Sequence, residues 1–262
     1  MQVYRGLDIG TAKPSREEQR RVRHHLIDIA DLNESFDAAR FVALAKAAVT
    51  DIQSRAKIPI FCGGTGLYFK AYLEGLGEAP PANPQLRAEL ESTPLPTLLK
   101  ELEQNDPVTY EKIDRQNPRR VVRALEVIRL TGRPFSEQRA AWKPAPHPNL
   151  FGISRSTSEL ATRINERVDE MFRQGLVAET EALLKRGLEQ NRTAMQAIGY
   201  KQVVEHLHGQ RSLPETIELV KIRTRQFAKR QLAWFRRQMQ LRWLNAADDT
   251  MAGINKAVAR RG

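Results

Sequence analysis

The spacing of apolar residues predicts alternating strands and helices in the first third of the chain. Short apolar runs at 25–29 and 58–62 are typical of strands, and they alternate with predicted helices over 35–55 and from 67 to about 76. The helix over 35–55 is apolar along one face, so we expect it to pack on a sheet. The order strand, helix, strand, helix predicts a parallel sheet.

Proline-rich segments at 79–84 and 143–148 enclose a stretch with a helical pattern. Three helices in this stretch are predicted to begin alike, with a capping side chain and then a proline, at Asn83-Pro84, Asp106-Pro107 and Asn117-Pro118. We therefore predict a helical insertion domain over 81–149 between the two parts of an α/β core, 1–80 and 150–262.

The last third of the chain predicts long helices between two short strands. Residues 150–153 are expected to form a short strand and 241–244 a last edge strand, and apolar residues between 160 and 175 follow helical spacing. Ser212 and Glu215 have the spacing of a capping box, which predicts the start of a long helix.

This predicted C-terminal helix is strongly basic. Between 219 and 245 there is no acidic residue, and the basic residues are Lys221, Arg223, Arg225, Lys229, Arg230, Arg236, Arg237 and Arg242. The formal net charge of the whole chain is +11, which favours a polyanionic partner. A solvated helix face is the alternative, but charge of one sign along a helix repels itself without an anion. We favour RNA or DNA, and we expect Phe227 and Trp234 to be core residues rather than base-stacking ones.

Composition argues against a membrane-spanning or disulfide-bonded protein. No stretch approaches the roughly 18 consecutive apolar residues that cross a bilayer, and the start has no signal pattern, so we expect a cytoplasmic protein. Cys62 is the single cysteine and ends a predicted strand, so we expect it to be packed rather than reactive. His24 and His25 would point to opposite faces of a strand, which disfavours a metal site.

The run from 58 to 70 passes from an apolar strand through Gly63, Gly64 and Gly66 into a helix. Glycines let the backbone approach a ligand, and amides at the start of the next helix attract an anion. A tight turn that needs glycine only for its backbone explains the same residues, so both interpretations stay open.

Several motifs resemble those of the tRNA dimethylallyltransferases and follow one another in the order of that family. They are MQVYRGLDIGTAK at 1–13, HHLID at 24–28, GGTGLYFK at 63–70, QNPRR at 116–120, AIGYK at 197–201 and TRQFAKRQ at 224–231. The chain is similar to the bacterial type, because it has no zinc-finger tail like that of eukaryotic members. Arg23 stands where we expect the family to have proline.

The resemblance implies transfer of a dimethylallyl group from dimethylallyl diphosphate to N6 of adenosine 37 in tRNA. It also implies a P-loop-NTPase-like parallel sheet core with an all-helical insertion domain for tRNA binding, Mg²⁺ as cofactor, and a monomer in full-length form. Two other functions stay open, a non-catalytic RNA-binding protein and an adenylate isopentenyltransferase acting on free adenine nucleotides. The insertion and the basic helix favour tRNA over so small a substrate.

Members of the family begin with a strand and the phosphate-binding loop G-x-x-x-x-G-K-[ST], followed by an Asp-Ser pair. None of these is present in this sequence, and Gly10-Thr-Ala-Lys13 lacks the required spacing. We therefore interpret Met1 as an internal methionine of a longer protein, with an incomplete sheet core and most Mg²⁺ ligands missing. We expect this chain alone to have no transferase activity, because nothing grips the departing diphosphate. We also expect it to aggregate or to unfold with poor cooperativity.

By resemblance, Thr65 is the expected catalytic residue, with its hydroxyl near the adenosine. The residues expected to bind tRNA are Met1, Gln2, Thr65, Arg87, Gln116, Asn117, Pro118, Arg119, Arg120, Arg225, Lys229 and Arg230. A hydroxyl that only caps the following helix is the alternative for Thr65. An ordinary capped helix with exposed arginines is the alternative for 116–120. No residue of the chain is assigned to the diphosphate or to a metal.

Overall fold

The structure is a computed structural model that describes residues 1–140, 142 and 149–246. The second proline-rich segment predicted above, 143–148, therefore lies outside the described residues.

The chain divides into two compact units. The first comprises Met1–Gly66 with Pro144–Gly262, and the second comprises Leu67–Lys143. The predicted insertion over 81–149 overlaps the second unit, and its bounds as a domain stay a prediction.

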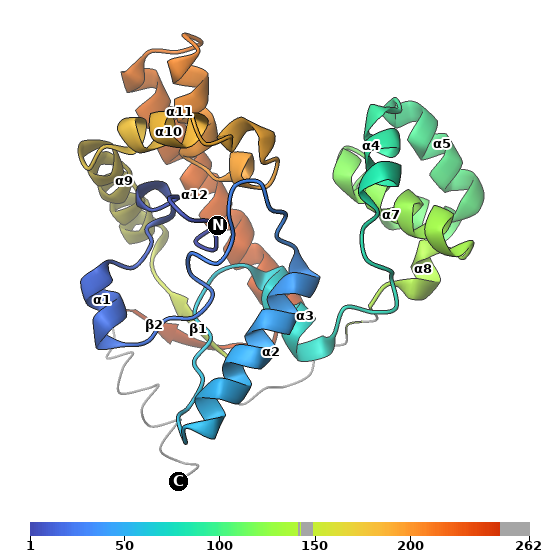
Figure 1. Ribbon diagram of the computed structural model, residues 1–262, viewed down its shortest axis with the longest axis horizontal. Helices are drawn as coiled ribbons and strands as arrows, with labels where there is room; N and C mark the ends of the chain where they lie inside the picture. The colour runs from blue at the N-terminus through green and yellow to red at the C-terminus, as the bar shows by residue number, and fades with distance from the viewer. Residues whose placement is uncertain (141, 143–148, 247–262) are drawn as a thin grey trace. The chain divides into compact units, whose positions relative to one another are not determined.

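The first unit is rich in helices and contains a small parallel sheet (Figure 1). Its helices are α1 (Arg16–Arg21), α2 (Ala38–Ser54), α9 (Thr157–Arg173), α10 (Leu176–Leu184), α11 (Tyr200–Leu207) and α12 (Leu213–Gln238). Helix α3 (Gly66–Glu74) begins at its boundary, and single turns of 3₁₀ helix lie at η1 (Ile9–Thr11), η2 (Leu188–Gln190) and η3 (Ala194–Gln196).

The sheet consists of β1 (Phe151–Ser154) and β2 (Arg242–Asn245), which pair in parallel with Phe151 opposite Arg242. Both strands were predicted from the sequence, and both are confirmed to within one residue. Two segments far apart in the sequence are thereby joined beside α12, the longest of the described helices.

The strands predicted over 25–29 and 58–62 are wrong for the described residues. Neither segment forms a ladder, and the isolated bridge between Tyr4 and Ala30 lies one residue beyond the first of them. A strand is defined by its pairing with a neighbour, which an apolar run cannot reveal. The side chains confirm that 58–62 is uncovered, because Ile58 is 67% exposed and Ile60 is 84% exposed. Cys62 is exposed as well, so its predicted packing is also wrong.

Helices α9 and α12 form a central core of the first unit. Ile164 and Val168 of α9 pack with Val220 of α12. The predicted capping box starts α12, because Ser212 accepts from the amide of Glu215 and the carboxylate of Glu215 accepts from the amide of Ser212. From there α12 runs 26 residues, which is about 39 Å at 1.5 Å per residue.

The second unit is helical. Its complete helices are α4 (Pro84–Ser92), α5 (Leu95–Asn105), α6 (Pro107–Lys112), α7 (Pro118–Thr131) and α8 (Phe135–Gln138). Helix α7 supplies most of the core, and its buried face packs on Leu90 of α4 and on Leu98 and Leu102 of α5. The second unit therefore has a hydrophobic core of its own.

The three predicted proline starts are confirmed at α4, α6 and α7, but their caps differ. Asn83 accepts from Leu86 N at 3.0 Å, and Asp106 accepts from Thr109 N at 2.9 Å. Asn117 makes no such bond, so its predicted capping role is wrong in the structure. The N-cap of α7 therefore lacks the side-chain hydrogen bond that the other two helices have.

Candidate functional site

The glycine-rich junction at 63–66 lies against α12. Gln231 donates from Nε2 to the carbonyl oxygen of Gly64 at 2.8 Å. A Cβ atom on Gly64 would lie 1.9 Å from the Gln231 amide, and one on Gly66 would lie 2.0 Å from the Trp234 ring. Neither open interpretation of the glycines included this contact. Glycine is needed here because α12 approaches the backbone too closely for a side chain.

Thr65 lies between the two glycines that α12 contacts. Its side chain is exposed, and no hydrogen bond joins its hydroxyl to another group among the described residues. The structure therefore gives no support to the alternative that this hydroxyl caps α3. Thr65 is presented to solvent from a backbone that is held on both sides.

The first residues of the chain are tied to η1. The side chain of Gln2 donates from Nε2 to the carbonyl oxygens of Thr11 and Ala12, at 3.1 and 3.0 Å. Ala12 has a φ of 48°, a left-handed conformation, so this amide stabilises an unfavourable turn. Met1 is exposed beside it. The side-chain amide nitrogen of Gln2 thus donates its hydrogen bonds within the protein. The predicted contacts of Met1 and Gln2 with tRNA stay predictions.

The segment from Gly10 to Lys13 is not a phosphate-binding loop, because side chains of this protein already accept hydrogen bonds from the amides at its start. Both carboxylate oxygens of Glu179 accept from Ile9 N, at 3.1 and 3.0 Å, and the Tyr200 hydroxyl accepts from Gly10 N at 3.1 Å. The same hydroxyl donates to Glu179 at 2.5 Å. A Cβ atom on Gly10 would lie 2.5 Å from the Tyr200 ring. Two separate motifs, 1–13 and 197–201, thus meet through one buried tyrosine.

Lys13 joins two of the sequence motifs, a contact that the sequence did not indicate. Its side chain is only 4% exposed, and its Nζ lies 3.0 Å from Tyr4 O and 2.5 Å from carboxylate oxygens of both Asp8 and Asp28. Because Asp28 belongs to the motif at 24–28, this lysine fastens that motif to the first 13 residues. An ion pair across such a distance in sequence has no local signal.

The basic helix α12 has both paired and exposed cations. Lys221 is paired with Asp169 at 2.8 Å and with Glu218, and these hydrogen bonds raise its pKa. Arg225 donates to Asn165, whereas Lys229 and Arg230 are exposed.

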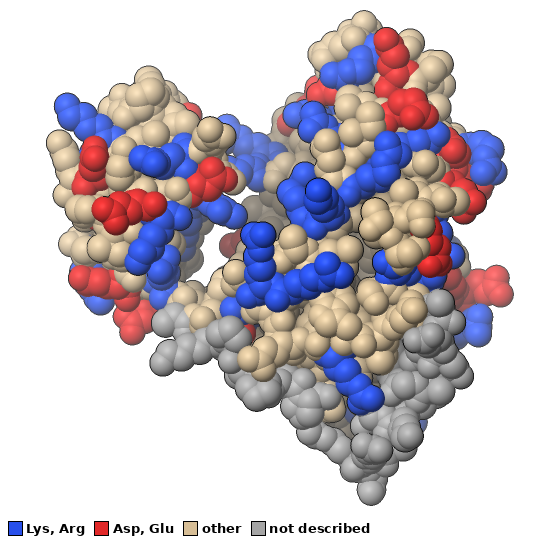
Figure 2. Space-filling model, turned by 180° about the vertical axis from the view of Figure 1, so that it is seen from behind, with Lys and Arg blue, Asp and Glu red and all other residues tan. Residues whose placement is uncertain are grey.

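Figure 2 shows that Lys and Arg gather on one face of the larger unit with few Asp and Glu among them. Phe227 is 46% exposed within α12, so its predicted place in the core is wrong. Trp234 is partly buried and packs against Gly66, in keeping with its predicted structural role.

In the second unit, the predicted motif at 116–120 forms the start of α7. Gln116, Pro118, Arg119 and Arg120 are exposed there, and Asn117 is half-buried. Arg87, predicted to contact tRNA, is paired with Glu126 at 2.5 Å and keeps its side chain 38% exposed. The structure thus places two exposed arginines at a helix start and a third in a pair with a buried carboxylate.

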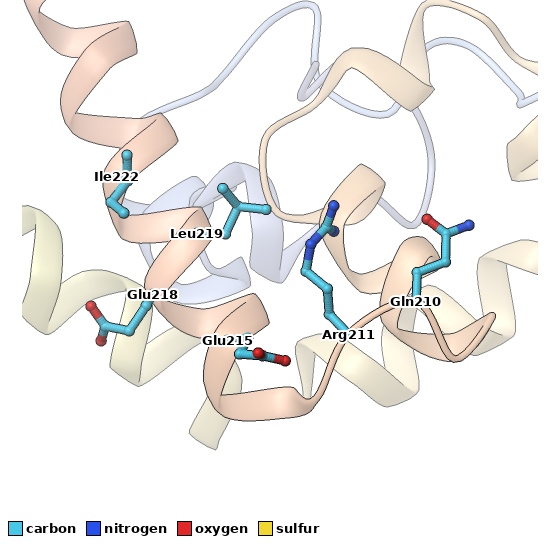
Figure 3. Close-up of a pocket in the computed structure, with 6 residues that line it drawn as sticks. All are labelled: Gln210, Arg211, Glu215, Glu218, Leu219 and Ile222. Atoms are coloured by element: carbon cyan, nitrogen blue, oxygen red, sulfur yellow. The ribbon is translucent and has the colours of Figure 1, made fainter.

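A surface pocket lies elsewhere, at the beginning of α12. It has a volume of about 440 Å³ and is lined by Gln210, Arg211, Glu215, Glu218, Leu219 and Ile222 (Figure 3). Its charged groups have partners within the chain: Glu215 binds Ser212, Glu218 binds Lys221 and Arg211 binds Glu205. Glu215 and Gln231 are roughly 24 Å apart along the helix. None of the predicted site residues lines this pocket.

The described part of the chain shows neither a metal cluster nor a membrane span. No group of three or more His, Cys, Asp or Glu side chains is placed there to hold a metal ion. Within the same residues, no helix is long and apolar enough to cross a membrane.

Comparison with known proteins identifies the family. The IPP transferase family matches residues 2–238. The tRNA dimethylallyltransferase 1 of Trichlorobacter lovleyi is 45% identical, over 98% of this chain and 86% of that protein. The tRNA dimethylallyltransferase of Desulforudis audaxviator is 42% identical, over 95% of this chain and 82% of the relative.

Solved structures agree with these relatives. The tRNA isopentenylpyrophosphate transferase of Staphylococcus epidermidis superposes with a TM-score of 0.69 and 34% identity, over all of this chain and 89% of that one. A eukaryotic dimethylallyltransferase described as acting on tRNA gives 0.70 and 28% identity, over all of this chain and 69% of that one. The predicted fold class, α/β with a parallel sheet and a helical insertion, is confirmed. The chain belongs to the IPP transferase family, a family of transferase enzymes to which the tRNA dimethylallyltransferases belong.

Proposed function

We propose that this protein transfers a dimethylallyl group from dimethylallyl diphosphate to N6 of adenosine 37 in tRNA. The family match over residues 2–238 carries the proposal, because it includes the junction at 63–66 together with the helix that holds it. The named relatives are tRNA dimethylallyltransferases, and one structural neighbour is described as acting on tRNA. We further propose that the protein acts as a monomer in the cytoplasm.

In this reaction the bond between C1 of the dimethylallyl group and the diphosphate oxygen breaks, and its electron pair leaves with the diphosphate. N6 of the adenine forms the new bond to C1 and releases one proton to solvent. We assign Thr65 the role of orienting the adenine amino group. Its exposed hydroxyl stands on backbone fixed by Gln231 and Trp234, and a fixed donor or acceptor keeps N6 in line with the breaking bond.

The tRNA is proposed to lie on the basic surfaces of each unit. Lys229 and Arg230 offer exposed cations on α12, and Arg119 and Arg120 do so at the start of α7. Contacts of these side chains with phosphates would hold the anticodon stem and loop without reading its sequence.

The diphosphate needs a further set of donors. The 262 residues contain no G-x-x-x-x-G-K-[ST] loop, and the described residues do not form a cluster that fits the expected Mg²⁺. We therefore assign no step to a metal held by them. We infer that this 262-residue polypeptide by itself binds tRNA but does not prenylate it.

The proposal is tested in a bacterium that lacks its own tRNA dimethylallyltransferase. The full product of the gene, called the native protein below, is expressed there. It should produce isopentenyladenosine in total tRNA, measured by mass spectrometry of the nucleosides. Absence of that nucleoside, or product formed on free AMP and not on tRNA, would overturn the proposal. The 262-residue polypeptide should shift tRNA in a gel and give no product. Turnover by that polypeptide would contradict only the inference about its inactivity.

A further inference from the structure

Glu126 lies in the middle of α7 and is fully buried. One carboxylate oxygen accepts from Asn83 N at 2.9 Å, and the other accepts from Arg87 at 2.5 Å and Arg123 at 2.7 Å. Burial by itself raises the pKa of Glu126, but the hydrogen bonds from Arg123 and Arg87 outweigh it and hold this pKa below its ordinary value. Glu126 is therefore ionised at neutral pH, and all its partners are donors.

The two arginines in this cluster keep a net positive charge, because a single carboxylate faces two guanidinium groups. Arg123 also donates to the carbonyl oxygen of Pro80 at 2.6 Å. Even so, the side chains of Arg87 and Arg123 are 38% and 31% exposed. A guanidinium has five N–H donors in a rigid fork, so each arginine can bind Glu126 and a second anion together.

The cluster continues the basic start of α7. Arg123 lies three residues after Arg120 and four after Arg119, a spacing that places side chains on neighbouring positions of one helix face. Over 67–143, Lys and Arg exceed Asp and Glu by only one residue. A polyanion would therefore be bound in this unit by local arrangement rather than by overall charge.

The resemblance already assigns Arg87 to tRNA. We propose that Glu126 is a positioning residue that holds the guanidinium groups of Arg87 and Arg123 together, so that the two arginines meet an RNA phosphate as a preorganised pair. A long flexible side chain loses rotamer freedom when it binds, and an arginine already fixed by a buried carboxylate loses less. This inference rests on the proposed function, because it takes tRNA as the polyanion.

The decisive variant is Glu126→Gln in the native protein. It keeps the shape of the side chain and raises the net charge by one. If Glu126 only offsets charge, tRNA should bind more tightly. If Glu126 positions the arginines, the variant should bind tRNA roughly tenfold more weakly despite the added charge. Equal or tighter binding would overturn the proposal, provided that thermal melting shows the variant folded at the assay temperature.

Variants of the arginines test the two guanidinium groups directly, with thermal melting as the control, because each variant removes one partner of the buried carboxylate. Arg123→Gln and Arg87→Gln should each raise the KM for tRNA while kcat changes little. Each should also reduce the slope of log Kd against log salt by about 0.7 to 0.9. Lys100→Gln, which removes an exposed cation from α5 in the same unit, is the matched control and should change neither quantity measurably.

The double variant separates positioning from support of the fold. If Glu126 acts through Arg87, then Arg87→Gln should add less than twofold to the loss already caused by Glu126→Gln. Full additivity would contradict the positioning role. If the unsubstituted protein forms no isopentenyladenosine, the proposed function fails. If it does, and the arginine variants bind like the parent, only this inference fails.

Discussion

Gln231 and Gly64 are 167 positions apart, and a hydrogen bond of 2.8 Å joins the side-chain amide of one to the backbone oxygen of the other. The bond attaches the glycine-rich junction to the basic helix α12. Thr65 is the next residue, so the attachment of Gly64 also fixes the backbone that carries the Thr65 hydroxyl. The glycines serve this attachment, because any side chain on Gly64 or Gly66 would collide with α12.

Gly66→Ala should destabilise the protein more than Gly64→Ala. The new methyl group at 66 meets the bulky Trp234 ring at 2.0 Å, whereas at 64 it meets the flexible end of Gln231. We expect a loss of about 1–3 kcal/mol for Gly66→Ala and less for Gly64→Ala, measured by urea unfolding. Replacing Gln231 by alanine should reduce the loss at Gly64 and leave the loss at Gly66 unchanged. The reverse order would show that the helix does not press on this backbone.

Thr65→Ala in the native protein should lower kcat for prenylation at least tenfold while tRNA affinity changes less than twofold. The hydroxyl is assigned to the reacting amino group and not to the holding of RNA. Thr65→Ser retains the hydroxyl and is the matched control, which should keep most of the activity. Equal losses of kcat and tRNA affinity would argue for a role in binding instead.

The contact between Tyr200 and Glu179 predicts a pH dependence. Burial and the hydrogen bond to Glu179 raise the pKa of Tyr200 above its ordinary value of 10.0. The folded state therefore holds this proton more tightly than the unfolded state, and the resulting stability is present below about pH 10 and is lost as the pH rises above it. The free energy of unfolding should fall less steeply above pH 10 in Tyr200→Phe than in the parent.

At neutral pH the same substitution should cost about 1–3 kcal/mol, because it leaves Gly10 N and Glu179 without a shared partner. Urea unfolding at pH 7 measures this loss. A variant as stable as the parent would show that the buried hydroxyl contributes nothing net.

Apolar exposure at 58–62 predicts self-association of the 262-residue polypeptide. Ile58 and Ile60 are largely uncovered, and so is Ile153 of β1. Ile60→Lys should lower light scattering and dye binding, because it places a charge in the exposed run. Val22→Lys is the control: it changes an apolar residue that is 67% exposed at the C-terminal cap of α1, outside this run, and it should have a smaller effect. A polypeptide that is monomeric from the start would contradict the prediction.

Local signals in the sequence located the helices well. The capping box of Ser212 and Glu215 and the prolines at the starts of α4, α6 and α7 each act within a few residues of the helix end that they mark. Two of the predicted strands are confirmed, at 150–153 and 241–244, whereas the two at 25–29 and 58–62 are wrong. The difference lies in pairing, which depends on residues far away in the chain.

The candidate site was predictable only in part, for the same reason. The resemblance pointed to Thr65 and to the arginines at the start of α7, whose places in the structure agree with an exposed surface. It did not indicate that Glu126 pairs with Arg87, 39 positions away. Nor did it indicate that the carboxylate of Glu179 accepts a hydrogen bond from Ile9 N at the start of η1. Nor did the mixed pattern around Phe227 reveal that this ring is exposed.

The length of helix α12 fixes the distance between two of its contacts. It packs on α9 at Val220 and holds the glycine-rich junction at Gln231, so the number of residues between these points sets both a length and an angle. Inserting one residue there would turn Gln231 and Trp234 by about 100° away from the glycines. Inserting four would restore the direction but displace both side chains by about 6 Å. The helix is therefore constrained in length as well as in composition, and a deletion at its solvated middle should be as harmful as the loss of either contact.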